Sequence, residues 1–214
     1  MQKNSSTHST GSTNSGQARL TTKGFTLIEL LVVVAILAIL SVVVILTLNP
    51  AQMLKQARDS QRLSDMATLK SAISLYLQDV STLSIGSSAT CYGSAPATPA
   101  GVGCGSRMSA SDATVTTTTA ASSTSVGGAA GNGWIPINFT AISSGAPIGS
   151  LPIDPVNNAT YFYSYATNAS PNYQFEINSD MESTRYAASG TSDVESTDGG
   201  TNTAVYEVGT SLSL

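Results

Sequence analysis

The chain has few of the residues from which most enzyme sites and metal centres are built. Of its 214 residues, 10% are charged, one is a histidine, His8, and two are cysteines, Cys91 and Cys104. Catalytic pairs of the Ser–His or Cys–His kind need a histidine beside the nucleophile, and zinc sites combine several His or Cys ligands. The sequence also has no Gly-rich phosphate-binding loop. We therefore predict that the protein is not an enzyme and carries no metal or other cofactor.

Positive charge is scarce after the first residues. The first 24 residues hold three basic residues and no acid, whereas residues 71–214 hold ten acids and two arginines. Positive charge ahead of an apolar segment predicts a cytoplasmic N-terminus and an exported remainder. The acidic remainder argues against binding to nucleic acid, which requires cations that neutralise phosphates.

The main feature that is present is an apolar segment from Phe25 to Leu48. It contains no Gly or Pro and only one charged residue, Glu29. At about 1.5 Å per residue a helix of this length spans roughly 36 Å, which is enough to cross a hydrocarbon core of about 30 Å. Because backbone groups in lipid must be satisfied within the segment, we predict a transmembrane helix over 25–48.

The residues around the start of this segment carry a recognisable motif, KGFTLIELLVVVAILAIL. This sequence resembles the N-terminal signature of the type IV pilin and pseudopilin family. In that family a prepilin peptidase cuts after the Gly and methylates the new N-terminal amine. The resemblance implies cleavage between Gly24 and Phe25 and removal of the basic leader 1–24, together with His8. The alternative is an ordinary signal anchor with a chance acid.

Glu29 needs a partner, because an unpaired carboxylate in lipid costs about 3 kcal/mol. The segment offers no basic side chain, but cleavage would create an amine at Phe25. The resemblance to pilins supports an assembly role, in which Glu29 of one subunit pairs with the Phe25 amine of the next. The alternative is that Glu29 only caps its own helix.

Asn49-Pro50 ends the apolar run, and two interpretations compete there. Asn49 can cap a second helix that begins at Pro50, with Gln52 completing a capping box, or one kinked helix can continue through. We favour the kinked helix over 25–80. Its second half has a polar stretch, interpreted as a solvated face or as a surface for neighbouring subunits: Lys55, Gln56, Arg58, Asp59, Gln61, Arg62 and Asp65. An apolar stripe at helical spacing follows: Met66, Leu69, Ile73, Tyr76 or Leu77, and Val80.

The exported head, residues 81–214, divides into a predicted loop and a predicted sheet. Residues 81–133 are rich in Gly, Ser and Thr, so we expect a long loop with little strand content. Cys91 and Cys104 lie in this loop, and in an exported domain such a pair predicts a disulfide. Residues 134–214 predict an antiparallel sheet, with a hairpin built from two alternating Tyr- and Phe-containing stretches and a third strand at 184–188 or 204–208.

Acidic residues cluster in the C-terminal loops, at Asp180, Glu182, Asp193, Glu195 and Asp198. Carboxylates suit Ca²⁺, and major pseudopilins bind calcium in such a loop. The spacing here matches no calcium motif, and we favour an acidic, solvated loop without metal.

Together these features predict an α+β fold, in which a long N-terminal helix packs against a small antiparallel sheet as in pilins. The implied function is that of a structural subunit of a type IV pilus-like filament. Its partners would be copies of itself in a helical homopolymer, the prepilin peptidase, an inner-membrane assembly platform and, before assembly, membrane lipid. It would move from the inner membrane to an extracellular filament. Alternatives are a pseudopilin of a secretion or DNA-uptake machine, and a minor pilin or adhesin.

Overall fold

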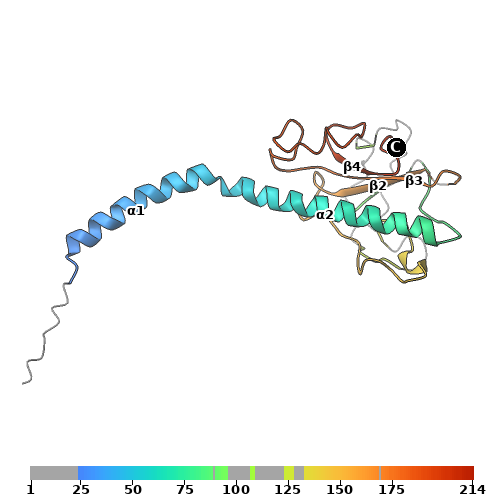
Figure 1. Cartoon of the computed structure of the whole chain (residues 1–214), viewed down its shortest axis with the longest axis horizontal. Helices are drawn as coiled ribbons and strands as arrows, with labels where there is room; N and C mark the ends of the chain where they lie inside the picture. The colour runs from blue at the N-terminus through green and yellow to red at the C-terminus, as the bar shows by residue number, and fades with distance from the viewer. Residues whose placement is uncertain (1–23, 89, 96–106, 109–122, 128–132, 169) are drawn as a thin grey trace, which may run out of the picture. The chain divides into compact units, whose positions relative to one another are not determined.

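The computed structural model describes residues 24–88, 90–95, 107–108, 123–127, 133–168 and 170–214 (Figure 1). The chain divides into two compact units, Met1–Thr47 and Leu48–Leu214. The first contains all but the last residue of helix α1, Leu27–Leu48. The second is the head, and its elements in chain order are α2 (Pro50–Asp79), β1 (Thr90–Gly93), η2 (Phe139–Ala141), β2 (Tyr163–Asn168), β3 (Gln174–Ser179) and β4 (Tyr206–Gly209).

Helix α1 satisfies its own polar groups. The hydroxyl of Ser41 donates to the carbonyl of Leu37 at 2.7 Å, and that of Thr47 donates to the carbonyl of Val43 at 3.1 Å. These bonds reduce the free-energy cost of placing two hydroxyl groups in an apolar segment, because each hydroxyl has a hydrogen-bond partner within the helix. The part from Leu27 to Ile45 is long and apolar enough to cross a membrane.

The helix is interrupted at Asn49, which differs from the favoured prediction of one kinked helix over 25–80. Asn49 adopts a left-handed backbone conformation with φ 41°, and Pro50 is the first residue of α2. The Asn49 side chain accepts a hydrogen bond from the Gln52 backbone N–H at 3.4 Å. The capped second helix is therefore the interpretation that the structure supports. Proline disfavours helical geometry in the residue before it, and Asn tolerates the left-handed conformation that results.

Helix α2 runs along one face of the sheet (Figure 1). Its apolar stripe packs against that face. Met66, Leu69, Ile73 and Tyr76 are buried, as predicted, and Leu77 and Val80 pack at the edge of the same cluster. The sheet supplies the opposite wall from alternate residues of its strands: Tyr92, Tyr163, Tyr165, Phe175, Ile177 and Val208. This face forms the main hydrophobic core of the head.

The loops before the sheet complete this core. Trp134 is fully buried, and its indole N–H donates to the carbonyl of Pro152 at 2.9 Å, which ties two loops together. Ile135, Ile137 and Leu151 are buried beside it. This segment therefore contributes to the core without forming a strand.

The sheet has four antiparallel strands in the order β1-β2-β3-β4. The predicted hairpin is β2–β3, and the third predicted strand is β4, so the second of its two proposed positions is the right one. Strand β1 lies inside the stretch 81–133 that we predicted to be loop. It pairs with β2, with Tyr92 opposite Tyr165, so the sheet begins earlier in the chain than expected. The architecture is α+β and pilin-like, as predicted.

The second face of the sheet is polar and is also buried. Its side chains alternate with those of the core: Ser164, Ala166, Glu176, Asn178 and Glu207. A second cluster lies on this face, in which Phe162 and Met108 pack with Cys91 and Ala166, and Leu214 lies at its edge.

Candidate processing and assembly site

The predicted site residues Gly24, Phe25 and Glu29 lie at the start of α1. Gly24 and Phe25 precede the helix, and the Phe25 side chain is 85% exposed. A Cβ atom placed on Gly24 would meet no atom within 4 Å. Among the described residues the space around the predicted cleavage position is therefore open, which suits access by a peptidase.

Glu29 forms a reciprocal capping box with Thr26. The backbone N–H of Thr26 donates to Glu29 Oε2 at 2.8 Å, and the Thr26 hydroxyl donates to the same oxygen at 2.7 Å. In return the backbone N–H of Glu29 donates to the Thr26 hydroxyl oxygen at 3.3 Å. Because Thr26 stands directly before Leu27, the spacing is that of an N-cap and the third helical residue.

The capping box shows what Glu29 does within one chain. It satisfies two N–H groups that the first turn of a helix leaves without partners, and it places a negative charge where the helix dipole favours it. Both donated bonds end on Oε2, and Oε1 accepts no hydrogen bond from the described residues. Thr26 is the residue that our sequence reasoning missed, although the spacing Thr-x-x-Glu was a readable signal for it.

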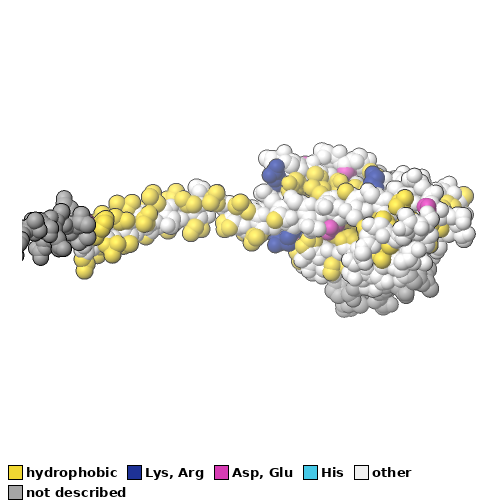
Figure 2. Space-filling model, turned by 60° about the horizontal axis from the view of Figure 1, so that its bottom comes forward, with side chains coloured by type: hydrophobic (Ala, Val, Ile, Leu, Met, Phe, Trp, Pro, Cys, Tyr) yellow, Lys and Arg dark blue, Asp and Glu magenta, His cyan; other side chains and the backbone are white. Residues whose placement is uncertain are grey.

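Hydrophobic side chains cover most of the surface of helix α1 behind this site (Figure 2). Its described large hydrophobic side chains are between 47% and 82% exposed. At about 25 cal/mol per Å² such a surface is strongly unfavourable in water. The helix therefore requires lipid or other apolar helices around it.

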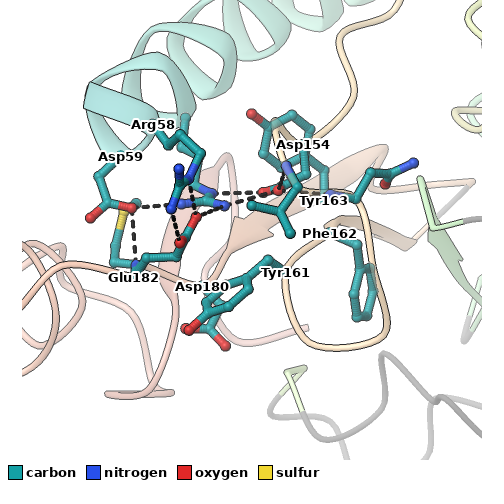
Figure 3. Close-up of polar contacts among 12 residues, drawn as sticks. Arg58, Asp59, Asp154, Tyr161, Phe162, Tyr163, Asp180 and Glu182 are labelled. Carbon is teal, nitrogen blue, oxygen red and sulfur yellow. Dashed lines mark hydrogen bonds and ion pairs between the residues drawn. The ribbon is translucent and has the colours of Figure 1, made fainter. Parts of the chain in front are cut away.

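The predicted polar stretch of α2 is not simply a solvated face, which corrects that interpretation. Arg62 and Asp59 are fully buried, and the Arg62 guanidinium reaches three carboxylates. These carboxylates belong to Asp59, Asp154 and Glu182, which are labelled in Figure 3. The guanidinium donates to Asp154 at 2.7 and 2.9 Å, to Asp59 at 2.7 Å and to Glu182 at 2.7 Å. Its donors are thereby committed within the subunit and are not available to a neighbouring one.

Charge within this cluster is well compensated. Burial opposes the charge on Arg62, but its hydrogen bonds, first of all to Asp154, raise the pKa of the guanidinium above its ordinary value. A bidentate pair with Arg58, at 2.8 and 2.6 Å, together with the bond from Arg62, lowers the pKa of Glu182. The cluster joins α2 to the loops that carry Asp154 and Glu182, so it fixes these loops on the helix.

The other acids of the C-terminal cluster do not face a common centre: Asp180 forms an ion pair with Arg107 at 3.8 Å, and the rest bind backbone N–H groups. Glu195 accepts from Met181 and Ala188, each at 2.8 Å, and burial raises its pKa to about 7. Asp198 accepts from Glu207 at 2.6 Å. Within the described ranges no group of three or more His, Cys, Asp or Glu residues could hold a metal ion.

Cys91 is fully buried in β1. Cys104 lies outside the described residues, so the disulfide between the two cysteines stays a prediction.

Comparison with known families agrees with the geometry at the start of α1. Residues 19–45 match the model of the prokaryotic N-terminal methylation motif. This motif is the type IV pilin and pseudopilin signature, and the chain carries it over the predicted cleavage position and most of α1. The chain has no match among curated proteins or among solved structures.

Proposed function

We propose that the protein is the structural subunit of a type IV pilus-like filament. The observation that carries this proposal is the methylation motif placed on an exposed cleavage position that leads directly into an apolar helix. Proteins with this motif are typically structural rather than enzymatic. The motif implies processing by a prepilin peptidase and anchoring in a membrane before assembly.

Processing would occur between Gly24 and Phe25. The peptidase removes residues 1–24 and methylates the amine of Phe25, which then begins the mature chain. The new cation lies next to Thr26 and within one helical turn of Glu29, whose Oε1 accepts no bond from the described part of the chain. A charged amine at this position would pair with that oxygen.

Assembly would proceed by transfer of α1 from lipid to a bundle of copies of itself. The exposed apolar side chains of α1 supply the contact area, and Glu29 sets the axial register when it binds the Phe25 amine of an incoming subunit. Capping by Thr26 holds the carboxylate at a fixed place on the helix, which favours this pairing. In the alternative, Glu29 remains only a cap.

The head would face the cell exterior once the filament has grown. Its acidic character, its α2–sheet core and the proposed Cys91–Cys104 disulfide suit an exported domain. An inner-membrane assembly platform would receive the subunit, and no nucleic acid is expected as a partner. A pseudopilin of a secretion or DNA-uptake machine and a minor pilin or adhesin are the alternative roles of the same precursor.

The decisive experiment is electron microscopy of surface fibres from cells that express the chain, with mass spectrometry of the fibre subunit. Abundant long fibres whose subunit begins at N-methylated Phe25 are the expected result. Short fibres that depend on a secretion machine would instead support the pseudopilin role. Detection at fibre tips alone would support a minor pilin. A surface protein that retains Met1 would contradict the proposal.

A further inference from the structure

Two glutamates lie together on the polar face of the sheet. Glu176 is on β3 and Glu207 is on β4, and they are 0% and 1% exposed. In the β3–β4 register Glu176 faces Gly209 and Asn178 faces Glu207, so the two carboxyl groups are diagonal neighbours. They are within hydrogen-bonding reach of each other. Glu207 Oε1 is buried and receives no hydrogen from any donor in the described part of the chain.

The remaining oxygens of this pair bind the segments that border the polar face. Glu176 Oε2 accepts from the backbone N–H of Leu214 at 2.9 Å, and Glu207 Oε2 accepts from that of Asn202 at 3.0 Å. The Asn178 amide donates to Glu176 at 3.4 Å and to the carbonyl of Arg107 at 3.1 Å. Glu176 therefore fastens Leu214 to the polar face of the sheet, whereas Thr210 and Ser211 are held by their own backbone bonds to the carbonyl of Phe175.

Two carboxyl groups in contact and away from water cannot both ionise, because burial and like charge both penalise the second negative charge. The charged and titratable side chains nearby do not relieve this. Asp198, bonded to the Glu207 backbone, adds negative charge, and Tyr206 on β4 is uncharged at neutral pH. The Arg107 guanidinium donates to the carbonyls of Thr160 and Phe162 and forms its ion pair with Asp180 at 3.8 Å.

Burial, reinforced by the adjacent carboxyl group, raises the pKa of Glu176 to about 8, and burial likewise raises the pKa of Glu207. A proton between the two groups would supply the donor that Glu207 Oε1 lacks. The burial of both carboxyl groups, the absence of a donor to Glu207 Oε1 among the described residues and the raised pKa values all favour a protonated group in this pair at neutral pH.

We propose that Glu176 and Glu207 share one proton, that this proton holds residues 212–214 on the polar face of the sheet, and that alkaline pH releases the segment. Removal of the proton would leave two facing carboxylates, which separate to regain water. Leu214 would then leave the apolar cluster formed by Cys91, Met108, Phe162 and Ala166, and part of this cluster would be uncovered. The proposal concerns the head alone and does not depend on filament assembly.

We call the Glu176–Glu207 pair, together with the segment that it holds, the latch. Hydrogen exchange of the full chain in detergent micelles tests whether the latch opens as the pH rises. Mass spectrometry of a peptide covering 206–214 reports the protection of the Leu214 amide and its neighbours, corrected for the intrinsic pH dependence of exchange. Linkage predicts that protection falls about tenfold per pH unit between the ordinary carboxyl pKa and that of the pair. Protection that stays constant from pH 6 to pH 8 would overturn the proposal.

Glu207→Gln is the diagnostic variant, because its amide can donate to Glu176 without a titrating proton. Its protection should be independent of pH over the same range, and Glu176→Gln should behave alike if the first variant folds poorly. Glu195→Gln is the matched control, since Glu195 is another buried glutamate with a raised pKa but lies outside the latch. This control should keep the wild-type decline. If Ca²⁺ restored wild-type protection at pH 8, the pair would be a cation site and the proton latch would be wrong.

Discussion

At the scale of single residues, Glu29 caps its own helix and, in our proposal, also pairs with the Phe25 amine of another subunit. A variant that removes only the charge separates these two roles. Glu29→Gln keeps an oxygen that accepts from Thr26, so the cap and membrane insertion should survive, while the ion pair with the Phe25 amine is lost. We expect normal cleavage after Gly24 but sharply reduced incorporation into fibres. Immunoblots of sheared fibres against total cell protein measure the ratio. Polymerisation at the wild-type level would show that the charge is dispensable.

Thr26→Val provides the complementary variant. It removes the hydroxyl that binds Glu29 and keeps the shape and the carboxylate. Loss of an N-cap costs about 1 kcal/mol, so incorporation should fall only moderately. Thr26→Ser retains the hydroxyl and should match wild type. If Thr26→Val were as defective as Glu29→Gln, the cap rather than the intermolecular charge would explain the need for Glu29.

Arg62 and Arg58 differ in burial, so their removal should differ in its effect on stability. Arg62 is fully buried, whereas the Arg58 side chain is 34% exposed, although both bind Glu182. Arg62→Met would leave Asp59 and Asp154 buried without their cation and should cost about 3–5 kcal/mol of head stability. Arg58→Met should cost about 1 kcal/mol or less. Urea unfolding of the full chain in detergent, followed by Trp134 fluorescence, measures both. Equal losses would contradict the buried-cluster argument.

At the scale of elements, the break between α1 and α2 depends on one residue with positive φ. Asn49→Gly keeps the backbone conformation and loses the side-chain cap, which costs a few tenths of a kcal/mol. Asn49→Ala loses the cap and also strains the backbone, so the first turn of α2 should be weakened by about 1–2 kcal/mol. Hydrogen exchange over residues 50–56 measures this. The same exchange in both variants would show that Asn49 does not determine the break.

The same scale shows which elements could be predicted from sequence. The hairpin β2–β3 was visible because aromatic and polar residues alternate along both strands, and α2 because its apolar residues recur at helical spacing. Strand β1 was missed because four residues, with Tyr92 as the only large side chain, carry no periodicity. Its pairing with β2 is decided by packing on Tyr165.

The candidate site residues also divide into those that a local sequence pattern indicates and those that only tertiary packing brings together. Gly24, Phe25 and Glu29 are adjacent in sequence, so a local motif identifies them together. Two of the three carboxylate partners of Arg62 lie 92 and 120 residues away, and no helical pattern indicates that a polar stretch will meet them. The paired glutamates of the sheet were missed for the same reason, since strand register alone brings Glu176 and Glu207 together.

At the scale of the whole molecule, the stability of the head should have an optimum in pH. The reason is that the fold lowers the pKa of one buried carboxyl group and raises the pKa of another. Hydrogen bonds from Arg58 and Arg62 lower the pKa of Glu182 below its value in the unfolded chain. Its contribution to stability is therefore present above that unfolded value and is lost as the pH falls through the folded pKa. Burial raises the pKa of Glu195 to about 7, so its contribution is present below the unfolded value and is lost as the pH rises through about 7.

The free energy of unfolding of the head should accordingly be highest near pH 5 and should fall on both sides. Each group contributes a slope of about 1.4 kcal/mol per pH unit between its folded and unfolded pKa values. Trp134 is the only tryptophan and is buried in the core, so its fluorescence in urea reports the unfolding of the head at each pH. Glu195→Gln should flatten part of the decline from pH 5 to pH 7, because its amide does not titrate. Asp79→Asn, at an exposed acid at the end of α2 that binds Ser143, should leave that decline unchanged. Stability that rises steadily from pH 5 to pH 8 would show that Glu195 is ionised at little cost in the folded head, and that the burial argument for this residue is wrong.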